Sequence, residues 1–60
     1  MKKKKKYSGF ARYGQGGWVK YYTHAYSETQ ATKQIRNKHR EAMNLGREAF
    51  IQIQEMQVLT

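Results

Sequence analysis

The most distinctive alternation of apolar and polar positions lies in residues 18–26, which read WVKYYTHAY. If this segment is a β-strand, successive side chains point to opposite faces. One face suits an ordinary half-buried core and carries Val19, Tyr21, Thr23 and Ala25. The other face mixes three aromatic rings with a lysine and a histidine, and it carries Trp18, Lys20, Tyr22, His24 and Tyr26. The second set is too rich in aromatic rings for an idle solvent face and too polar for a simple core.

Two further segments have the pattern of strands. Residues 7–13, YSGFARY, predict a first strand, and the glycine-rich residues 14–17 predict a hairpin loop between it and residues 18–26. Residues 49–54 alternate cleanly, with Ile51 and Ile53 on one face and Gln52 and Gln54 on the other. The alternation breaks at Glu55, so residues 56–60 are either a bulged continuation of this strand or a loose tail.

Between the second and third strands, the pattern changes to that of a helix over residues 28–45. Ser27 and Gln30 fit a capping box at its start, and Gly46 is placed to end it. A spacing of 100° per residue gathers an apolar side, with Lys38 projecting onto it and His39 beside it. That side consists of Ala31, Ile35, Ala42 and Leu45. The opposite side is a secondary basic face with Lys33, Arg36 and Arg40.

These elements predict one small α+β domain over residues 7–60, preceded by a basic disordered tail over residues 1–6. A right-handed connection through the helix gives a two-layer β-β-α-β fold with strand order 2-1-3. The helix covers one face of the sheet, and nothing in the sequence covers the other face. The register of the first strand stays open, since either Phe10 and Arg12 or Ala11 and Tyr13 could join Trp18 on the uncovered face.

The charge of the chain points to an anionic partner. Lysine and arginine number 12 against four acidic residues, so the net charge is +8. Such a field attracts nucleic acid, an anionic membrane or an acidic protein. The basic tail adds to this attraction through Lys2, Lys3, Lys4, Lys5 and Lys6. No apolar run approaches the roughly 20 residues of a membrane span, and there is no cysteine, so a cytoplasmic location is expected.

The uncovered face predicts a small basic nucleic-acid-binding module, for single strands or RNA. Aromatic rings stack on bases, and the rings available are Trp18, Tyr22 and Tyr26. Lys20 and Arg12 are expected to bind phosphates. His24 lies on the same face, and the amides of Gln52 and Gln54 can bond to base edges.

An alternative uses the same face for protein. A small adaptor or inhibitor of the viral or accessory type could dock on an acidic protein there, or the chain could form a homodimer, because tryptophan, tyrosine and arginine are common in binding hot spots. An enzyme is not expected, since the chain has no aspartate or cysteine and Ser27 serves as a cap. No cofactor or shared metal is expected either, because His24 and His39 fall on different layers.

Overall fold

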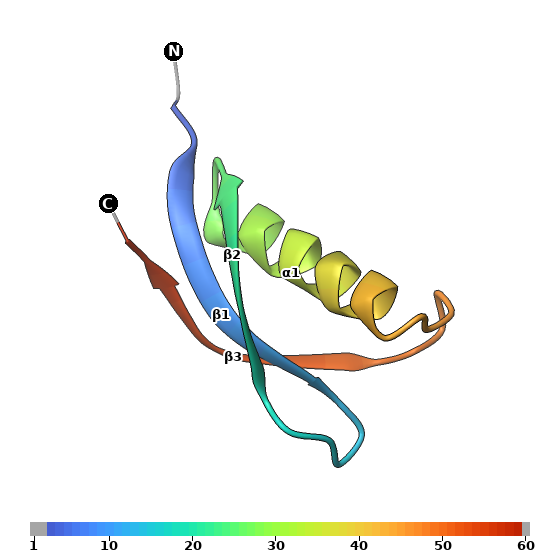
Figure 1. Ribbon diagram of the computed structural model, residues 1–60. Helices are drawn as coiled ribbons and strands as arrows, with labels where there is room; N and C mark the ends of the chain where they lie inside the picture. Colours follow the sequence, from blue (N-terminus) through green and yellow to red (C-terminus); the bar gives the residue numbers. More distant parts are fainter. Residues whose placement is uncertain (1–2, 60) are drawn as a thin grey trace.

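The chain folds into a three-stranded sheet with one helix packed against it. The computed structural model describes residues 3–59 and has the elements β1 (Lys5–Tyr13), β2 (Val19–Ala25), α1 (Glu28–Ala42) and β3 (Ile51–Val58). The strand order is β2-β1-β3, and β1 runs antiparallel to both neighbours. The sheet curves around α1, which lies on one face only (Figure 1). The predicted α+β architecture and strand order are confirmed.

The pairing of β1 settles which of its side chains face the helix. Tyr7 and Ala11 are buried, and a Cβ on Gly9 would lie 3.3 Å from the Ile35 side chain of α1. Because side chains alternate along a strand, Phe10 and Arg12 point to the other side. Phe10 lies opposite Lys20 of β2 and Gln54 of β3.

β1 begins two residues earlier than the pattern predicts. Lys5 and Lys6 belong to the strand and lie opposite Ala25 and His24 of β2. The expected boundary of a disordered tail at residue 6 is therefore misplaced, since β2 extends far enough to offer these two residues backbone partners. Residues 3 and 4 precede the strand, and the remainder of the expected tail lies outside the described residues.

A β-bulge continues β3 past the break in its alternation. Between the pairs Ser8–Gln57 and Phe10–Gln54, β3 has one more residue than β1. Glu55 lies in this bulge with φ of 55°, a left-handed conformation that favours glycine. The extra residue reverses the phase of the strand, so Met56 packs with the core and Gln57 lies on the uncovered face. Residues 56–58 are thus a bulged continuation.

Replacing Glu55 with glycine should stabilise the fold, by up to about 1.5 kcal/mol. Relief of the left-handed strain is worth roughly 1–2 kcal/mol, and the extra flexibility of glycine offsets roughly 0.5–1 kcal/mol of it. Urea unfolding followed by circular dichroism measures the change. Glu55→Ala is the matched control, because alanine removes the carboxylate and keeps the backbone strain. If alanine stabilises as much as glycine, the gain comes from the lost charge instead.

The start of α1 follows the predicted capping box closely. Ser27 is the N-cap, and its hydroxyl accepts a hydrogen bond from the Gln30 N–H at 3.2 Å. The Gln30 side chain accepts from the N–H of Tyr26 at 2.7 Å, one residue before the position in the usual motif. These bonds fix the direction in which the chain leaves β2.

The end of α1 differs from the prediction of residue 45 with a cap at Gly46. The helix ends at Ala42, and Asn44 adopts the left-handed conformation with φ of 55°. The N–H of Leu45 donates to the Arg40 carbonyl at 2.8 Å, and that of Asn44 donates to the Glu41 carbonyl at 3.1 Å, which is a Schellman motif. Asparagine tolerates this conformation better than most residues, so it ends the helix before the glycine is reached.

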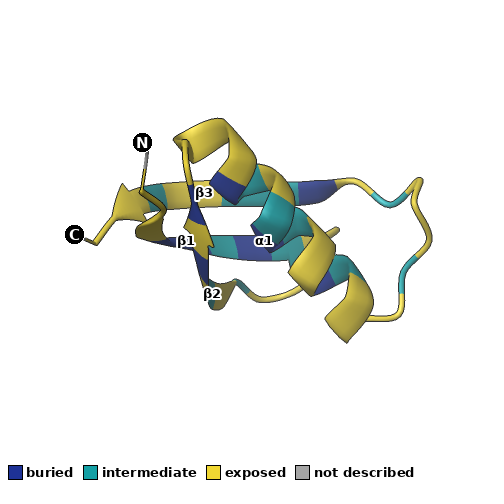
Figure 2. Cartoon of the chain, turned by 90° about the horizontal axis from the view of Figure 1, so that it is seen from above, coloured by how far each residue is buried: buried dark blue, intermediate teal, exposed yellow. Residues whose placement is uncertain are grey.

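The core lies where α1 crosses the sheet, as the buried positions in Figure 2 show. Ile35 packs with Ala11 and Ile51, while Ala31 packs with Tyr7 and Ala25. This contact row runs at every fourth helical residue and reaches His39, which is 2% exposed.

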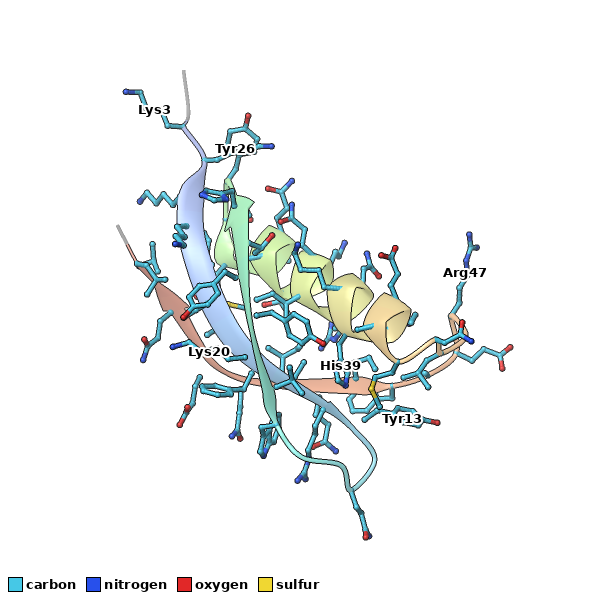
Figure 3. All side chains as sticks on the ribbon, viewed as in Figure 1. Lys3, Tyr13, Lys20, Tyr26, His39 and Arg47 are labelled. Carbon is cyan, nitrogen blue, oxygen red and sulfur yellow. The ribbon has the colours of Figure 1, made fainter. Side chains whose placement is uncertain are left out.

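Two positions near the C-terminal end of α1 are exposed, where the sequence predicted that they lie on its apolar side. Lys38 and Ala42 are exposed, although the helical projection placed both on the apolar side. The His39 imidazole takes the buried position because its Nδ1 forms a 2.8 Å hydrogen bond with the Tyr21 hydroxyl, whereas a buried ammonium group would lose its hydration without compensation. Figure 3 shows His39 between α1 and the sheet.

Among the described residues, no helix is long and apolar enough to cross a bilayer.

Candidate nucleic-acid interface

The side of the sheet away from α1 has no covering element, and we call it the open face. Its members alternate with the core-facing residues along each strand. β1 contributes Lys6, Ser8, Phe10 and Arg12, and β3 contributes Gln52, Gln54 and Gln57. β2 contributes Lys20, Tyr22 and His24, and Trp18 joins them from the position just before this strand. Lys4 and Tyr26 adjoin this face just beyond the Lys5–Ala25 pair, with the Lys4 ammonium over the Tyr26 ring. All eight residues predicted for the main binding face therefore lie on this side of the sheet or at its edge.

Aromatic rings and lysine ammonium groups are neighbours across the open face. The Lys20 ammonium lies 5.4 Å from the centre of the Tyr22 ring and 5.8 Å from that of Phe10. The Lys6 ammonium lies 5.1 Å from the centre of the same Tyr22 ring, and the Lys4 ammonium lies 5.7 Å from the centre of the Tyr26 ring. The pairing of β1 with β2 creates this pattern, since Phe10 lies directly opposite Lys20. Each ring thus has a cation within cation–π distance.

One end of the open face holds a more closely bonded group. The Arg12 guanidinium lies 4.6 Å from the centre of the Trp18 ring. Its Nε donates a hydrogen bond of 2.9 Å to Oε1 of Gln52, which lies opposite Arg12 on β3. Arg12, Trp18 and Gln52 are all half-buried, so this group is held more firmly than the lysines.

Two rings of the open face are exposed in spite of their cations, and the other two, Phe10 and Trp18, are half-buried. Tyr22 and Tyr26 are about half exposed, at 49% and 50%. His24 and Lys20 are exposed as well, and Figure 3 shows Lys20 on the side of the sheet away from α1. Positive charge predominates on this face, because three of the four acidic residues lie outside the strands. Two of the four are on α1, one is in the loop before β3 and one is at the bulge: Glu28, Glu41, Glu48 and Glu55.

The secondary basic face of α1 is divided by its contacts with the chain. Arg36 Nε donates to the Ile51 carbonyl at 3.1 Å, and an Arg40 terminal nitrogen donates to the Ala49 carbonyl at 3.1 Å. These two arginines therefore hold the start of β3 against α1. Lys33 is exposed and makes no such contact with the described residues. Helical spacing alone could not reveal this, because α1 packs with one flank toward β3.

The two histidines lie on opposite sides of the sheet, as predicted. His24 is exposed on the open face. His39 is buried between α1 and the sheet, and the centre of its ring lies 5.6 Å from that of Tyr21. Within residues 3–59, no group of three or more histidine, cysteine or acidic side chains is placed to hold a metal ion.

Sequence reasoning did not assign four residues to the open face that the structure places there: Lys6, Ser8, Phe10 and Gln57. Phe10 was left undecided because β1 has apolar residues on both of its faces, so alternation gives no clear register. Gln57 was missed because the bulge reverses the phase of β3 after Glu55. The break in alternation at Glu55 was the available signal, since the pattern QIQEMQV regains its alternation only if one residue is skipped.

Comparison with known proteins provides no further constraint on this surface: no family model matches the chain, and neither a curated protein nor a solved structure matches it significantly.

Proposed function

We propose that this chain binds single-stranded nucleic acid, including RNA, through the open face. The observation that supports this function best is the alternation of exposed rings with lysines on a sheet face that no other element covers. In this mode the bases stack on Trp18, Tyr22 and Tyr26, and the lysines between the rings contact phosphates. Nothing in this mode requires catalysis or a cofactor.

The internal cation–π contacts do not prevent stacking. An exposed contact of this kind is worth about 0.5–1 kcal/mol, whereas a base stacked on an aromatic ring contributes about 1–3 kcal/mol. A lysine that leaves a ring also gains a phosphate in its place, with release of counterions from the nucleic acid. Exchange of the lysine–ring contacts for bases and phosphates is therefore favourable.

The lysines also distinguish this surface from a protein-binding one. Protein interfaces are enriched in tryptophan, tyrosine and arginine, but they are depleted in lysine. On the open face, Lys6 and Lys20 lie among the rings instead of at the rim. An acidic protein partner or a second copy of the chain is therefore the less favoured occupant.

The curvature of the sheet favours single strands over duplex. Because α1 lies on the concave side, the open face is convex (Figure 1). A duplex is itself convex, so the two surfaces would touch over a small area. A single strand can follow the curve and turn its unstacked bases toward the rings.

Fluorescence of Trp18 gives the direct test of this proposal. Trp18 is the only tryptophan, and it lies on the open face beside Arg12. Titration with single-stranded RNA or DNA should shift or quench its emission, and a duplex of equal length should act only at higher concentration. An emission spectrum that no oligonucleotide changes at low salt would refute the proposal. Recovery of a protein partner that survives nuclease and high salt would favour the adaptor alternative.

Salt dependence should locate the phosphate contacts on the open face. Each phosphate neutralised on a single strand contributes about −0.7 to the slope of log K against log salt concentration. Lys20→Gln should therefore make the slope shallower by up to about 0.7. Lys33→Gln on α1 removes the same charge from the other side of the molecule and should leave the slope unchanged. Fluorescence anisotropy of a labelled oligonucleotide measures both slopes. Equal changes in the two variants would mean that net charge, and not this face, determines binding.

A further inference from the structure

The group formed by Arg12, Trp18 and Gln52 has a defined hydrogen-bonding character. Arg12 Nε can only donate, so the amide atom that faces it at 2.9 Å has to be the oxygen of Gln52. That bond fixes the orientation of the amide and directs its NH2 group away from Nε. The stacking of the guanidinium at 4.6 Å from the Trp18 ring limits its rotation. The side chains are thus arranged before any ligand arrives.

The polar groups that remain for a ligand are mainly donors. Both terminal nitrogens of Arg12 make no hydrogen bond to the described residues, and they form a planar fork of N–H donors. The NH2 of Gln52 adds two more donors. The Gln52 oxygen already accepts from Arg12 Nε and keeps one lone pair, so the free polar groups offer several donors against a single acceptor position. A suitable ligand therefore presents adjacent acceptors.

Among base edges, guanine matches this arrangement best. Its O6 and N7 are two adjacent acceptors that accept a bidentate arginine fork, whereas adenine presents a donor at N6 beside N7. Cytosine also has adjacent acceptors at O2 and N3, but its amino donor lies next to N3 and would face further donors. We propose that Arg12, held by Gln52 and Trp18, reads the O6/N7 edge of one guanine in a bound single strand. This inference rests on the proposed function and assigns Arg12 to a base, where the sequence suggested a phosphate.

The location of the group suits a base reader. Phe10 on β1 and Trp18 just before β2 lie on the same face of the sheet, so rings for stacking lie near the donors. Lys20, beside Phe10 and Tyr22, remains available for phosphate. Base reading at one end and phosphate binding along the strands can therefore occur together.

The test uses the full chain and a labelled uridine octamer with one variable central position. That position holds guanosine, 7-deazaguanosine, adenosine or cytidine. We expect guanosine to bind about 5- to 150-fold more tightly than adenosine, the range for a good bidentate contact. The 7-deaza base lacks only the N7 acceptor, so it should lose most of this preference. Fluorescence anisotropy at fixed salt gives the four affinities.

Two variants assign the preference to the proposed group. Arg12→Lys keeps the charge and removes the fork, so it should abolish the guanosine preference while the all-uridine octamer still binds. Arg47→Lys is the matched control, because Arg47 is exposed in the loop between α1 and β3, away from the open face (Figure 3), and it should keep the preference. If Arg12→Lys fails to fold by circular dichroism, the comparison of guanosine with 7-deazaguanosine on the native chain decides by itself.

The outcomes separate this inference from the proposed function. Equal affinity for guanosine, 7-deazaguanosine and adenosine overturns guanine reading and leaves single-strand binding intact. A loss of affinity in Arg12→Lys that is the same for every octamer assigns Arg12 to a phosphate and overturns the inference too, as does tightest binding of cytidine. If no octamer binds at all, the proposed function itself has failed.

Discussion

Replacing Ile35 with alanine should leave a large fraction of the molecules unfolded at room temperature. Ile35 is fully buried and contacts the sheet through Ala11 and Ile51, so it joins the two layers. Truncation of a buried isoleucine costs about 2–5 kcal/mol. A domain of this size rarely has more than about 3–5 kcal/mol of net stability. The two magnitudes are comparable, so one substitution can remove most of the stability of the fold.

Few other large apolar side chains are fully buried in the core. The other fully buried apolar side chains are small or lie at β3: Ala11, Ala25, Ala31 and Ile51. The larger side chains packed around this cluster are only partly buried: Tyr21, Leu45, Ile53 and Met56. Met56, whose flexible side chain lies near Gly9 and Ile35, is the best placed of them to fill part of the void left by alanine.

Urea and thermal unfolding followed by circular dichroism measure this effect. Ile35→Val is the conservative control, since it should cost only about 0.5–1.5 kcal/mol and leave the chain folded. An Ile35→Ala protein with the unfolding midpoint of the native chain would show that α1 does not pack on the sheet as described.

The double substitution Trp18→Ala and Tyr22→Ala should reduce single-strand affinity by about 2–6 kcal/mol, which amounts to loss of detectable binding at the upper end. Each ring contributes about 1–3 kcal/mol by stacking. The two residues are four positions apart along the strand, a separation of about 13 Å, so their effects should be close to additive. Anisotropy of a labelled oligonucleotide is the measurement, because the variant has lost its tryptophan.

The fold should tolerate this double substitution, because both side chains lie outside the core. Tyr13→Ala is the matched control. Tyr13 is 44% exposed, close to the 49% of Tyr22, but it lies on the α1 side of the sheet opposite Ile51. It should retain full affinity. Unchanged affinity in the double variant with an intact fold would exclude the open face as the binding site.

The sequence predicts the secondary structure well where a local pattern is strong. The alternation in residues 18–26 and the capping box at Ser27 depend only on neighbouring residues, and both appear in the structure. The helix end was wrong because two residues, Asn44 and Gly46, could each adopt a left-handed conformation. Packing of Leu45 with the core selects the earlier of the two.

The candidate site required long-range information. Phe10 joins the open face because β1 pairs with β2 in one register out of two, and Gln57 joins it because β3 has a bulge opposite Gly9. Conversely, two residues predicted for a basic binding face, Arg36 and Arg40, form part of the contact between α1 and the start of β3. Helical projection treats a helix as isolated, so it cannot distinguish a solvated arginine from one that bonds to a neighbouring strand.

By itself, the sequence determined the order of the elements, the start of the helix, the net charge and the two faces of residues 18–26. The net charge follows from composition, and the other properties follow from local backbone preference and from the period of side chains along one strand. The tertiary structure alone decided which cation lies over which ring, and it placed Arg12 between Trp18 and Gln52. Residues 12, 18 and 52 meet only when three strands pair, and the register of that pairing depends on the packing of the sheet against α1.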